Sequence, residues 1–147
     1  MTVLAAESRP GTMGLRLRIV EPEAAVPSDA DLTRLFRRRG ITRRRRARLR
    51  ALPKILATHG NQVLGLAAYD LGQDDLRVHE LACAPDSSFS GGAVMGQLLE
   101  WLELAAVAGG ARRVVILPWA VPAGMTLDWA GYSWAGLRAR GLEKRLL

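Results

Sequence analysis

Three short runs that favour β-strands follow one another between residues 54 and 84, and this succession restricts the fold more than any other feature. KILATHGNQVLGLAAYDL is predicted as a hairpin that turns at His59–Gly60–Asn61, and LRVHELACA follows a second turn at Gly72–Asp75. Glycine and asparagine at such points are typical of tight turns. Apolar runs of this length between turns are typical of strands. The region therefore predicts a hairpin followed by a third strand.

One strand and two helices are predicted before the hairpin. LRLRIV, residues 15–20, alternates polar and apolar side chains, which is typical of a strand. PSDADLTRLFRRRG, residues 27–40, predicts a helix, because Ser28 and Asp31 have capping-box spacing and a glycine stands at its end. Thr42 can cap a second short helix, which Pro53 ends.

A long helix, a strand and a final helix–strand pair are predicted after the third strand. Apolar residues recur at helical spacing over Val94–Ala108, and Gly109–Gly110 ends this helix. ARRVVILPWA is the most β-branched run and predicts a strand. A helix around 126–135 and a strand from about 137 complete the order β-α-α-β-β-β-α-β-α-β. This order predicts an α/β fold in which a mixed sheet has helices on both faces, with one domain at residues 14–147 after a flexible tail at 1–13.

Length and composition exclude several classes of protein. The chain of 147 residues is long enough for one domain with a single core. It has no uninterrupted run of 18 apolar residues, which argues against a membrane-spanning helix. The first residues lack the basic start and apolar run of a signal peptide, so a cytoplasmic protein is expected. Cys83 is the only cysteine, which excludes an internal disulfide, and two histidines without ligand spacing argue against a metal site.

Residues 34–50 contain ten arginines and no acidic residue, so the net charge of +7 belongs to this segment and not to the whole surface. Arg43–Arg46 are consecutive, and consecutive side chains on a helix point about 100° apart, so these arginines would surround it. Their mutual repulsion favours an anionic partner. Nucleic acid or an acidic protein bound at Arg37–Arg50 is one hypothesis, and a solvated basic helix that reflects compositional bias is the alternative.

The segment SSFSGGAVMGQLLEW, residues 87–101, brings two glycines to the start of the predicted long helix. The first N–H groups of a helix have no partner inside it, and the helix dipole favours negative charge there. Such a start can bind a phosphate group, although no arginine, lysine or glutamine precedes the helix in this segment. An ordinary strand-to-helix turn is the alternative interpretation.

Three further segments occur in a characteristic order. VLGLAAY (63–69) has a glycine between apolar strand residues, HELACAPDSS (79–88) has an acidic residue, an alternating apolar run and a proline, and YSWAGL (132–137) has Tyr-x-x-x-Gly before the last strand. In this order, over about residues 15–147, the chain resembles the GNAT superfamily of acyl-CoA-dependent N-acyltransferases. The resemblance implies the GNAT-like fold and the transfer of an acetyl group from acetyl-CoA to an amine.

The resemblance also implies which residues would bind acetyl-CoA. In the family, main-chain N–H groups of the loop and helix start bind the pyrophosphate, and the preceding strand pairs with the pantetheine arm. The matching positions are Leu81, Ala82 and Cys83 on the strand, and Phe89, Ser90, Gly91, Gly92, Ala93, Val94, Met95 and Gly96 at the loop and helix start. The loop motif is degenerate here: Ser90 replaces the family's Arg or Gln, and Ala93 and Met95 take the places of its two small residues.

Glu80 and Tyr132 are the catalytic candidates. A desolvated carboxylate beside the cofactor can take a proton from an ammonium acceptor through water, and the family's signature tyrosine protonates the departing thiolate. A surface glutamate and a buried tyrosine with a bonded hydroxyl are the alternatives. His79 and Glu80 should face opposite sides of a regular strand unless a bulge intervenes.

Two functional hypotheses follow. The first is an N-acetyltransferase whose acceptor is an amine on a small molecule, a protein N-terminus or a lysine; the arginines also suit an acidic or anionic substrate. The second is an inactive GNAT-like binding module that uses residues 34–50 to bind nucleic acid or an acidic protein. A purely structural subunit is a third interpretation, which predicts neither ligand and a stable homo-oligomer such as a homodimer. Cys83 is expected to be a small buried side chain, and the tryptophans are expected in the core: Trp101, Trp119, Trp129 and Trp134.

Overall fold

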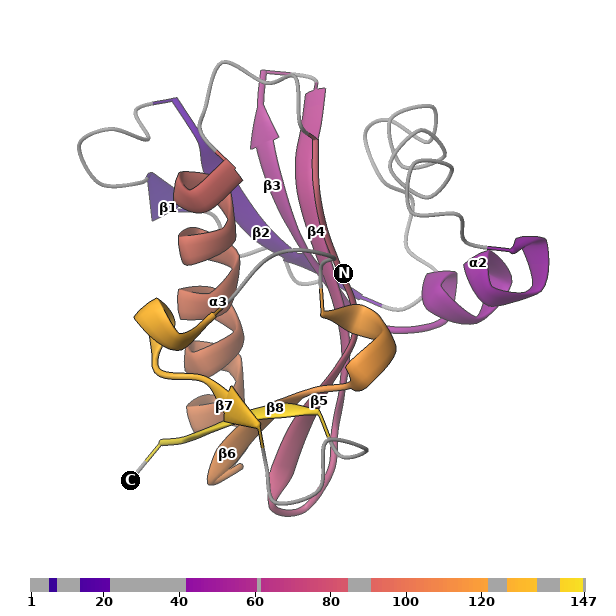
Figure 1. Ribbon diagram of the computed structural model, residues 1–147. Coiled ribbons are helices and arrows are strands. Elements are labelled where there is room, and N and C mark those ends of the chain that lie inside the picture. The colour runs from indigo at the N-terminus through magenta and orange to yellow at the C-terminus, as the bar shows by residue number, and fades with distance from the viewer. Residues whose placement is uncertain are drawn as a thin grey trace.

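The structure, a computed structural model, describes residues 6–7, 14–21, 42–60, 62–84, 91–121, 127–134 and 141–146. Its centre is one eight-stranded sheet with the order β1-β2-β3-β4-β5-β6-β8-β7 (Figure 1). The strands are β1 (Ala6–Glu7), β2 (Arg16–Val20), β3 (Lys54–His59), β4 (Gln62–Leu71), β5 (Asp75–Cys83), β6 (Arg113–Ile116), β7 (Ser133–Trp134) and β8 (Leu142–Arg145). β5 and β6 run parallel, and the other paired strands run antiparallel. The predicted mixed sheet is confirmed.

Helices lie on both faces of this sheet, as predicted. The helical elements among the described residues are α2 (Arg43–Arg50), α3 (Gly91–Ala108) and two 3₁₀ turns, η1 (Pro118–Ala120) and η2 (Asp128–Ala130). Figure 1 shows α3 against one face and α2 beyond the other. The larger hydrophobic core lies between α3 and the sheet, and a smaller cluster that includes Leu49 of α2 lies on the opposite face.

β4 is buried along most of its length because both of its faces are covered. Ala67 and Tyr69 belong to the core on the α3 side, whereas Leu66 and Ala68 belong to the cluster on the α2 side. This arrangement explains why VLGLAAY is a nearly continuous apolar run and does not alternate.

Gly65 of β4 allows α3 to approach the sheet closely. A Cβ atom at this position would lie 2.8 Å from Val94 Cγ1 and 3.1 Å from Leu98 Cδ1. Val94 is β-branched and has little rotational freedom, so it could not move aside easily. The glycine inside VLGLAAY therefore sets how near the first half of α3 lies to the sheet.

β5 contains a one-residue bulge at His79. The register pairs Val78 with Tyr69 and Glu80 with Ala68, so His79 is the extra residue of β5. A bulge bends its strand and changes the direction of a side chain. Its consequence for Glu80 is described below.

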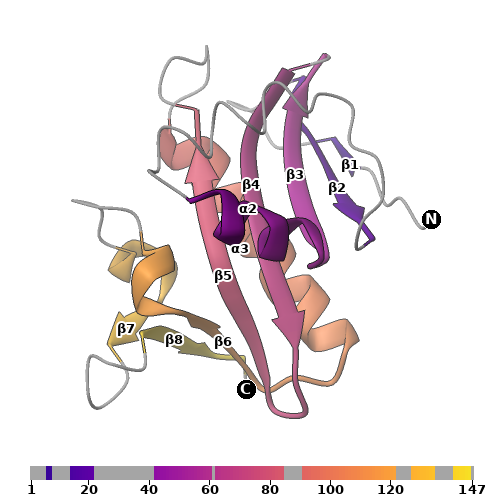
Figure 2. The same ribbon diagram turned by 90° about the vertical axis from the view of Figure 1, so that its right-hand side faces the viewer.

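β5 and β6 stay together for a short distance and then separate. Their parallel register covers Asp75–Val78 and Arg113–Ile116, and a further hydrogen bond joins Leu117 N–H to Val78 O at 3.1 Å. Pro118 then begins η1, which turns the chain aside. In Figure 2, β5 continues beyond this point beside β4 and without β6. Among the described strands, none pairs with the His79–Cys83 edge of β5 on the β6 side.

The start and the end of the domain differ from the predictions. The short strand β1 lies inside the predicted flexible tail and pairs with β2. α3 begins at Gly91 and not at Val94, so both glycines of its start are helical. The helix predicted around 126–135 is wrong in the part that is described. The short turn η2 is followed by Gly131, where φ is +91°, and Ser133–Trp134 then pair with β8. The helix predicted at 27–40 lies outside the described residues.

Three of the four tryptophans are not in the core. Trp119, Trp129 and Trp134 are 53%, 57% and 46% exposed, respectively, so the prediction is wrong for them. They belong to η1, η2 and β7, short elements that cover the end of the sheet and leave one side to solvent. Trp101 packs partly buried against the α3-side core.

Candidate functional site

The centre of the candidate site is the His79–Cys83 edge of β5 on the β6 side, called here the free edge because no described strand pairs with it. Ala84 N–H donates to Leu64 O of β4 at 2.7 Å. Because the main-chain groups of successive strand residues alternate in direction, those of Ala82 also face β4, while those of Leu81 and Cys83 face the side that β6 has left. Leu81 N–H donates to Glu80 Oε1 at 3.1 Å. Main-chain polar groups of Leu81 and Cys83 therefore face any molecule that lies between β5 and β6.

The bulge places His79 and Glu80 on the same face of the sheet, the α2 side. His79 Nε2 lies 2.5 Å from Oδ2 of Asp70, which shares this face with Ala68 two residues earlier on β4. Glu80 Oε2 lies 3.8 Å from Nη2 of Arg45 in α2. The two side chains would face opposite sides on a regular strand. Glu80 is 1% exposed, so it is a buried carboxylate and not a surface glutamate.

Arg45 reaches from α2 to this bulge. Its Nη2 donates to His79 O at 2.8 Å, and its guanidinium carbon lies 5.7 Å from the centre of the Trp119 ring. A cation at this distance from an aromatic face is attracted to it. In the sequence, Arg45 is one of ten arginines in residues 34–50, and no local signal distinguishes it from its neighbours.

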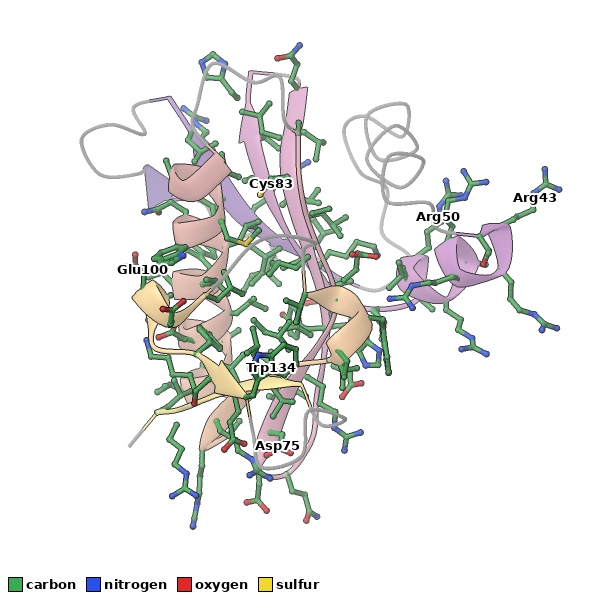
Figure 3. The ribbon with its side chains drawn as sticks, viewed as in Figure 1. Arg43, Arg50, Asp75, Cys83, Glu100 and Trp134 are labelled. Atoms are coloured by element: carbon green, nitrogen blue, oxygen red, sulfur yellow. The ribbon has the colours of Figure 1, made fainter. Side chains whose placement is uncertain are left out.

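α2 is fixed at both ends. At its start, the Thr42 side chain accepts a hydrogen bond from Arg45 N–H at 3.2 Å, which confirms the predicted cap. At its end, Lys54 is 2% exposed, and its Nζ donates to Arg50 O at 2.9 Å and to Leu52 O at 2.8 Å. The last carbonyls of a helix lack partners inside it and favour a nearby cation. Figure 3 shows Arg43 and Arg50 pointing outward from this helix.

The predicted phosphate-binding segment falls partly inside α3. A Cβ atom at Gly92 would meet no atom within 4 Å, so α3 has open space at this position. Val94 and Met95 are each 1% exposed and belong to the core, so Met95 does not fill that space. The N–H groups of Met95 and Gly96 lie beyond the first turn and are used within a regular helix. Phe89 and Ser90 lie outside the described residues.

Tyr132 is turned toward α3. It is 2% exposed, and its hydroxyl donates to Glu103 Oε2 at 3.3 Å. Lys144 Nζ lies 2.7 Å from Glu103 Oε1 and 5.8 Å from the centre of the Tyr132 ring. Burial, followed by the charge and hydrogen bond of Glu103, raises the pKa of Tyr132 far above its ordinary value, so the phenol remains protonated. Glu103 lies about 18 Å along the helix from Gly91.

Cys83 packs partly buried against the α3-side core, in agreement with the prediction. Burial raises the pKa of its thiol to about 12. A thiol that stays protonated is a weak nucleophile, so Cys83 contributes a small apolar surface to the free edge of β5.

A groove of about 570 Å³ begins at the first turn of α3 and runs between α3 and η2. Trp129 of η2 lies 3.7 Å from the position that a Cβ atom on Gly96 would take. The groove is lined by Gly92, Ala93, Gly96, Gln97, Leu99, Glu100, Glu103, Trp129, Ala130 and Lys144.

Two further features concern only the part of the chain that the structure describes. There, no helix combines the length and apolar character needed to cross a bilayer. No group of three or more His, Cys, Asp or Glu side chains in those residues could hold a metal ion.

No family model and no curated protein matches the sequence. The fold does match solved structures, each at low sequence identity. N-acetylglutamate synthase from Neisseria gonorrhoeae, complexed with coenzyme A and N-acetyl-glutamate, matches with 20% identity and a TM-score of 0.64 over 89% of this chain. The match covers 35% of that protein, so the present chain spans about a third of its length.

Two smaller proteins match along most of their own length. Aminoglycoside 6'-acetyltransferase type Ii has 14% identity and a TM-score of 0.64, over 88% of this chain and 97% of that one. The GNAT family N-acetyltransferase YhbS from Escherichia coli, in complex with CoA, has 17% identity and a TM-score of 0.61, over 100% of this chain and 84% of that one. The chain therefore has the GNAT acetyltransferase fold, as its sequence resemblance implied.

Proposed function

We propose that this protein is a GNAT-type N-acetyltransferase that transfers an acetyl group from acetyl-CoA to an amine. The observation that carries the proposal is the separation of β5 from β6 after Val78, which leaves one edge of β5 without a partner among the described strands, beside a buried carboxylate. The same fold occurs in solved acetyltransferases, some of them in complex with coenzyme A.

The donor would lie along this free edge. The pantetheine arm would bond to the carbonyl of Leu81, whose N–H is bonded to Glu80, and to main-chain groups of Cys83. Ala82 would contribute only its side chain, since its main chain faces β4. The pyrophosphate would accept hydrogen bonds from N–H groups of the first turn of α3, from Gly91 to Val94. In this proposal Phe89 and Ser90 extend that site, Met95 and Gly96 support it from within the helix, and the α3–η2 groove receives the part of the donor beyond the pyrophosphate.

Catalysis would depend on holding amine and thioester together, on removing protons from the amine nitrogen and on protonating the leaving thiolate. Glu80 would accept the proton of the acceptor ammonium, directly or through water. The freed amine would attack the thioester carbon and the carbon–sulfur bond would break, so that the coenzyme A thiolate leaves. The attacking nitrogen would lose its extra proton to water and become the amide nitrogen. Tyr132 remains the proposed donor of a proton to that thiolate, although its hydroxyl would have to leave Glu103 to do so.

Donor binding is tested with Gly92→Asp, with Gly92→Ser as the matched control. Both side chains have open space, and both residue types are tolerated at a helix start, so the fold should persist. The aspartate would repel a diphosphate, so the dissociation constant for acetyl-CoA should rise at least about tenfold in Gly92→Asp and stay near the wild-type value in Gly92→Ser. Titration calorimetry measures both. Absence of acetyl-CoA binding to the wild type at millimolar concentration would end the proposal.

The catalytic roles are tested separately. Glu80→Gln should lower kcat by about 10²–10⁴ with little change in acetyl-CoA affinity. Tyr132→Phe should lower kcat if the phenol donates the proton. An unchanged kcat in Tyr132→Phe would remove that role and leave Tyr132 as a structural partner of Glu103.

A second function, binding of nucleic acid or of an acidic protein through the arginine segment, is favoured by α2 itself. Arg43, Arg44, Arg48 and Arg50 are exposed, and the first turn of the helix contains no acidic residue. Binding of a labelled oligonucleotide should weaken steeply with salt and should fall when three exposed arginines of α2 are changed to serine. Binding that is insensitive to both changes would contradict this function.

A further inference from the structure

Arg45 reaches the buried Glu80 from α2 and contacts the groups around it. Three different groups converge on its guanidinium: the main-chain oxygen of His79 at 2.8 Å, the Glu80 carboxylate at 3.8 Å and the face of Trp119 at 5.7 Å. They come from β5 and η1, whereas Arg45 comes from α2. A carboxylate, a carbonyl and an aromatic face together form a set that recognises organic cations.

We propose that Glu80, the His79 carbonyl and the Trp119 ring form a binding site for a cationic amine, and that Arg45 is its internal occupant. The ligand enters by displacing the Arg45 side chain toward solvent. The inference rests on the proposed function only where it identifies this ligand with the acetyl acceptor. The site and its occupant are a property of the folded chain and can be tested without acetyl-CoA.

The burial of Glu80 defines the class of ligand. The carboxylate is 1% exposed, and a buried charge that loses an opposite charge is strongly destabilised. A neutral molecule that displaced Arg45 would remove positive charge from this position, whereas an ammonium or guanidinium group would restore it. The site therefore selects amines in their protonated form, and an acceptor that arrives as an ammonium can then pass its proton to Glu80.

Arg45 is held loosely enough to be displaced. Its side chain is 31% exposed, and its distance to Glu80 is close to the limit of an ion pair. Its Nε is buried and has no hydrogen-bond partner among the described residues, so no hydrogen bond of this nitrogen would be lost if the side chain moved. The anchors of α2 lie elsewhere, in the buried Leu49 and in the Lys54 contacts at the end of the helix. The side chain can therefore swing out while α2 stays in place.

The test measures binding of n-butylammonium to the full chain in the absence of acetyl-CoA. Binding is followed by NMR through the indole N–H of Trp119, which a Trp119→Phe spectrum assigns. Arg45→Ala removes the tethered cation that competes with the amine in the wild type, so the dissociation constant of the amine should be at least about tenfold lower in this variant. Arg44→Ala is the matched control, because it removes the same charge from an exposed position on α2 and should bind as the wild type does.

Two further variants complete the experiment. Arg45→Ala/Glu80→Gln should lose the gain in affinity, because the carboxylate that attracts the cation is gone. Arg45→Gln removes the cation but can still donate to the His79 carbonyl, so it replaces Arg45→Ala if that protein does not fold. Three results would each overturn the inference. The first is equal affinity for the amine in the wild type and in both Arg45 variants. The others are an equal gain in affinity in Arg44→Ala and a gain that persists when Glu80 is changed to glutamine.

Measurements of acetyl-CoA binding and of acetyl transfer distinguish a failure of this inference from a failure of the proposed function. If the protein is a transferase, the Arg45 variants should show a KM for n-butylamine lowered by a factor similar to the change in dissociation constant. If acetyl-CoA does not bind while the amine still gains affinity in Arg45→Ala, the transferase proposal fails and the cation site stands. If acetyl-CoA binds and the amine shows no gain, the cation site fails alone.

Discussion

Replacing Gly65 with alanine tests how closely α3 is seated on the sheet. The new Cβ atom would lie 2.8 Å from Val94 Cγ1, 3.1 Å from Leu98 Cδ1 and 3.3 Å from Ala82 O. Carbon atoms pack best at roughly 3.5–4.0 Å, so the nearest pair would be about 0.7 Å or more too close. Leu98 can move its terminal methyl group, whereas Val94 is β-branched and 1% exposed and has little freedom to rotate.

The expected loss of stability follows from two opposing effects. Overpacking of this kind costs roughly 1–3 kcal/mol, and alanine regains about 0.5–1 kcal/mol relative to glycine within a strand. The free energy of unfolding should therefore fall by about 1–2 kcal/mol. With a urea m-value of about 2 kcal/mol/M, the unfolding midpoint should fall by roughly 0.5–1 M. Val94→Ala removes the clashing Cγ1, so the double variant should be less destabilised than the sum of the single variants by about 1 kcal/mol.

Urea unfolding followed by far-UV circular dichroism measures these variants. Gly92→Ala is the matched control, because the same substitution there meets no atom within 4 Å at an exposed helical position. It should stabilise the protein by about 0.5–1 kcal/mol. A Gly65→Ala protein as stable as the wild type, or losses that add strictly in the double variant, would show that α3 is not packed against Gly65.

Three other substitutions or reactions have expected outcomes. Gly141→Ala should lower the free energy of unfolding by at least about 3 kcal/mol, because φ is +92° and the Cβ atom would lie 2.0 Å from Ile116 O; a thermal midpoint near that of the wild type would contradict this. Cys83 should react with iodoacetamide at pH 8 roughly 10³-fold more slowly in the native protein than in urea. The reason is that burial raises the pKa of its thiol from 9.0 to about 12, so less of the reactive thiolate is present at this pH. Equal reaction rates, measured by mass spectrometry, would refute the burial of this thiol. Asp75→Ala should cost less than about 1 kcal/mol and less still in high salt, because its ion pair with Arg113 is partly exposed; a larger, salt-independent loss would contradict that view.

Several elements could be predicted because their causes are local. Thr42 caps α2 through a hydrogen bond that spans three residues, and the hairpin turns where Gly60 takes a positive φ of 60°. The β4 run is buried on both faces, and its apolar composition indicated this directly. The start of α3 was placed too late because Gly91 and Gly92 have low helix propensity. The next turn packs into the core and holds them in the helix.

The candidate site was predictable only in part. The family resemblance indicates Glu80 as a candidate. Its burial depends on the tertiary structure, because Arg45 of α2 covers the face of β5 on which Glu80 lies. The helix expected around 126–135 failed because Ser133–Trp134 gain hydrogen bonds to β8, and pairing with a distant strand outweighs a weak local preference for helix.

The order of turns, caps and apolar runs along this chain, which resembles that of the GNAT superfamily, indicates a mixed sheet. Each of these signals depends only on residues that are close together in the sequence. The bulge at His79, the departure of β6 from β5 and the contact of Arg45 with Glu80 have no such signal. They arise because α2, β5 and η1, which are far apart in the chain, meet at one place, and a contact between distant segments depends on how the whole sheet packs.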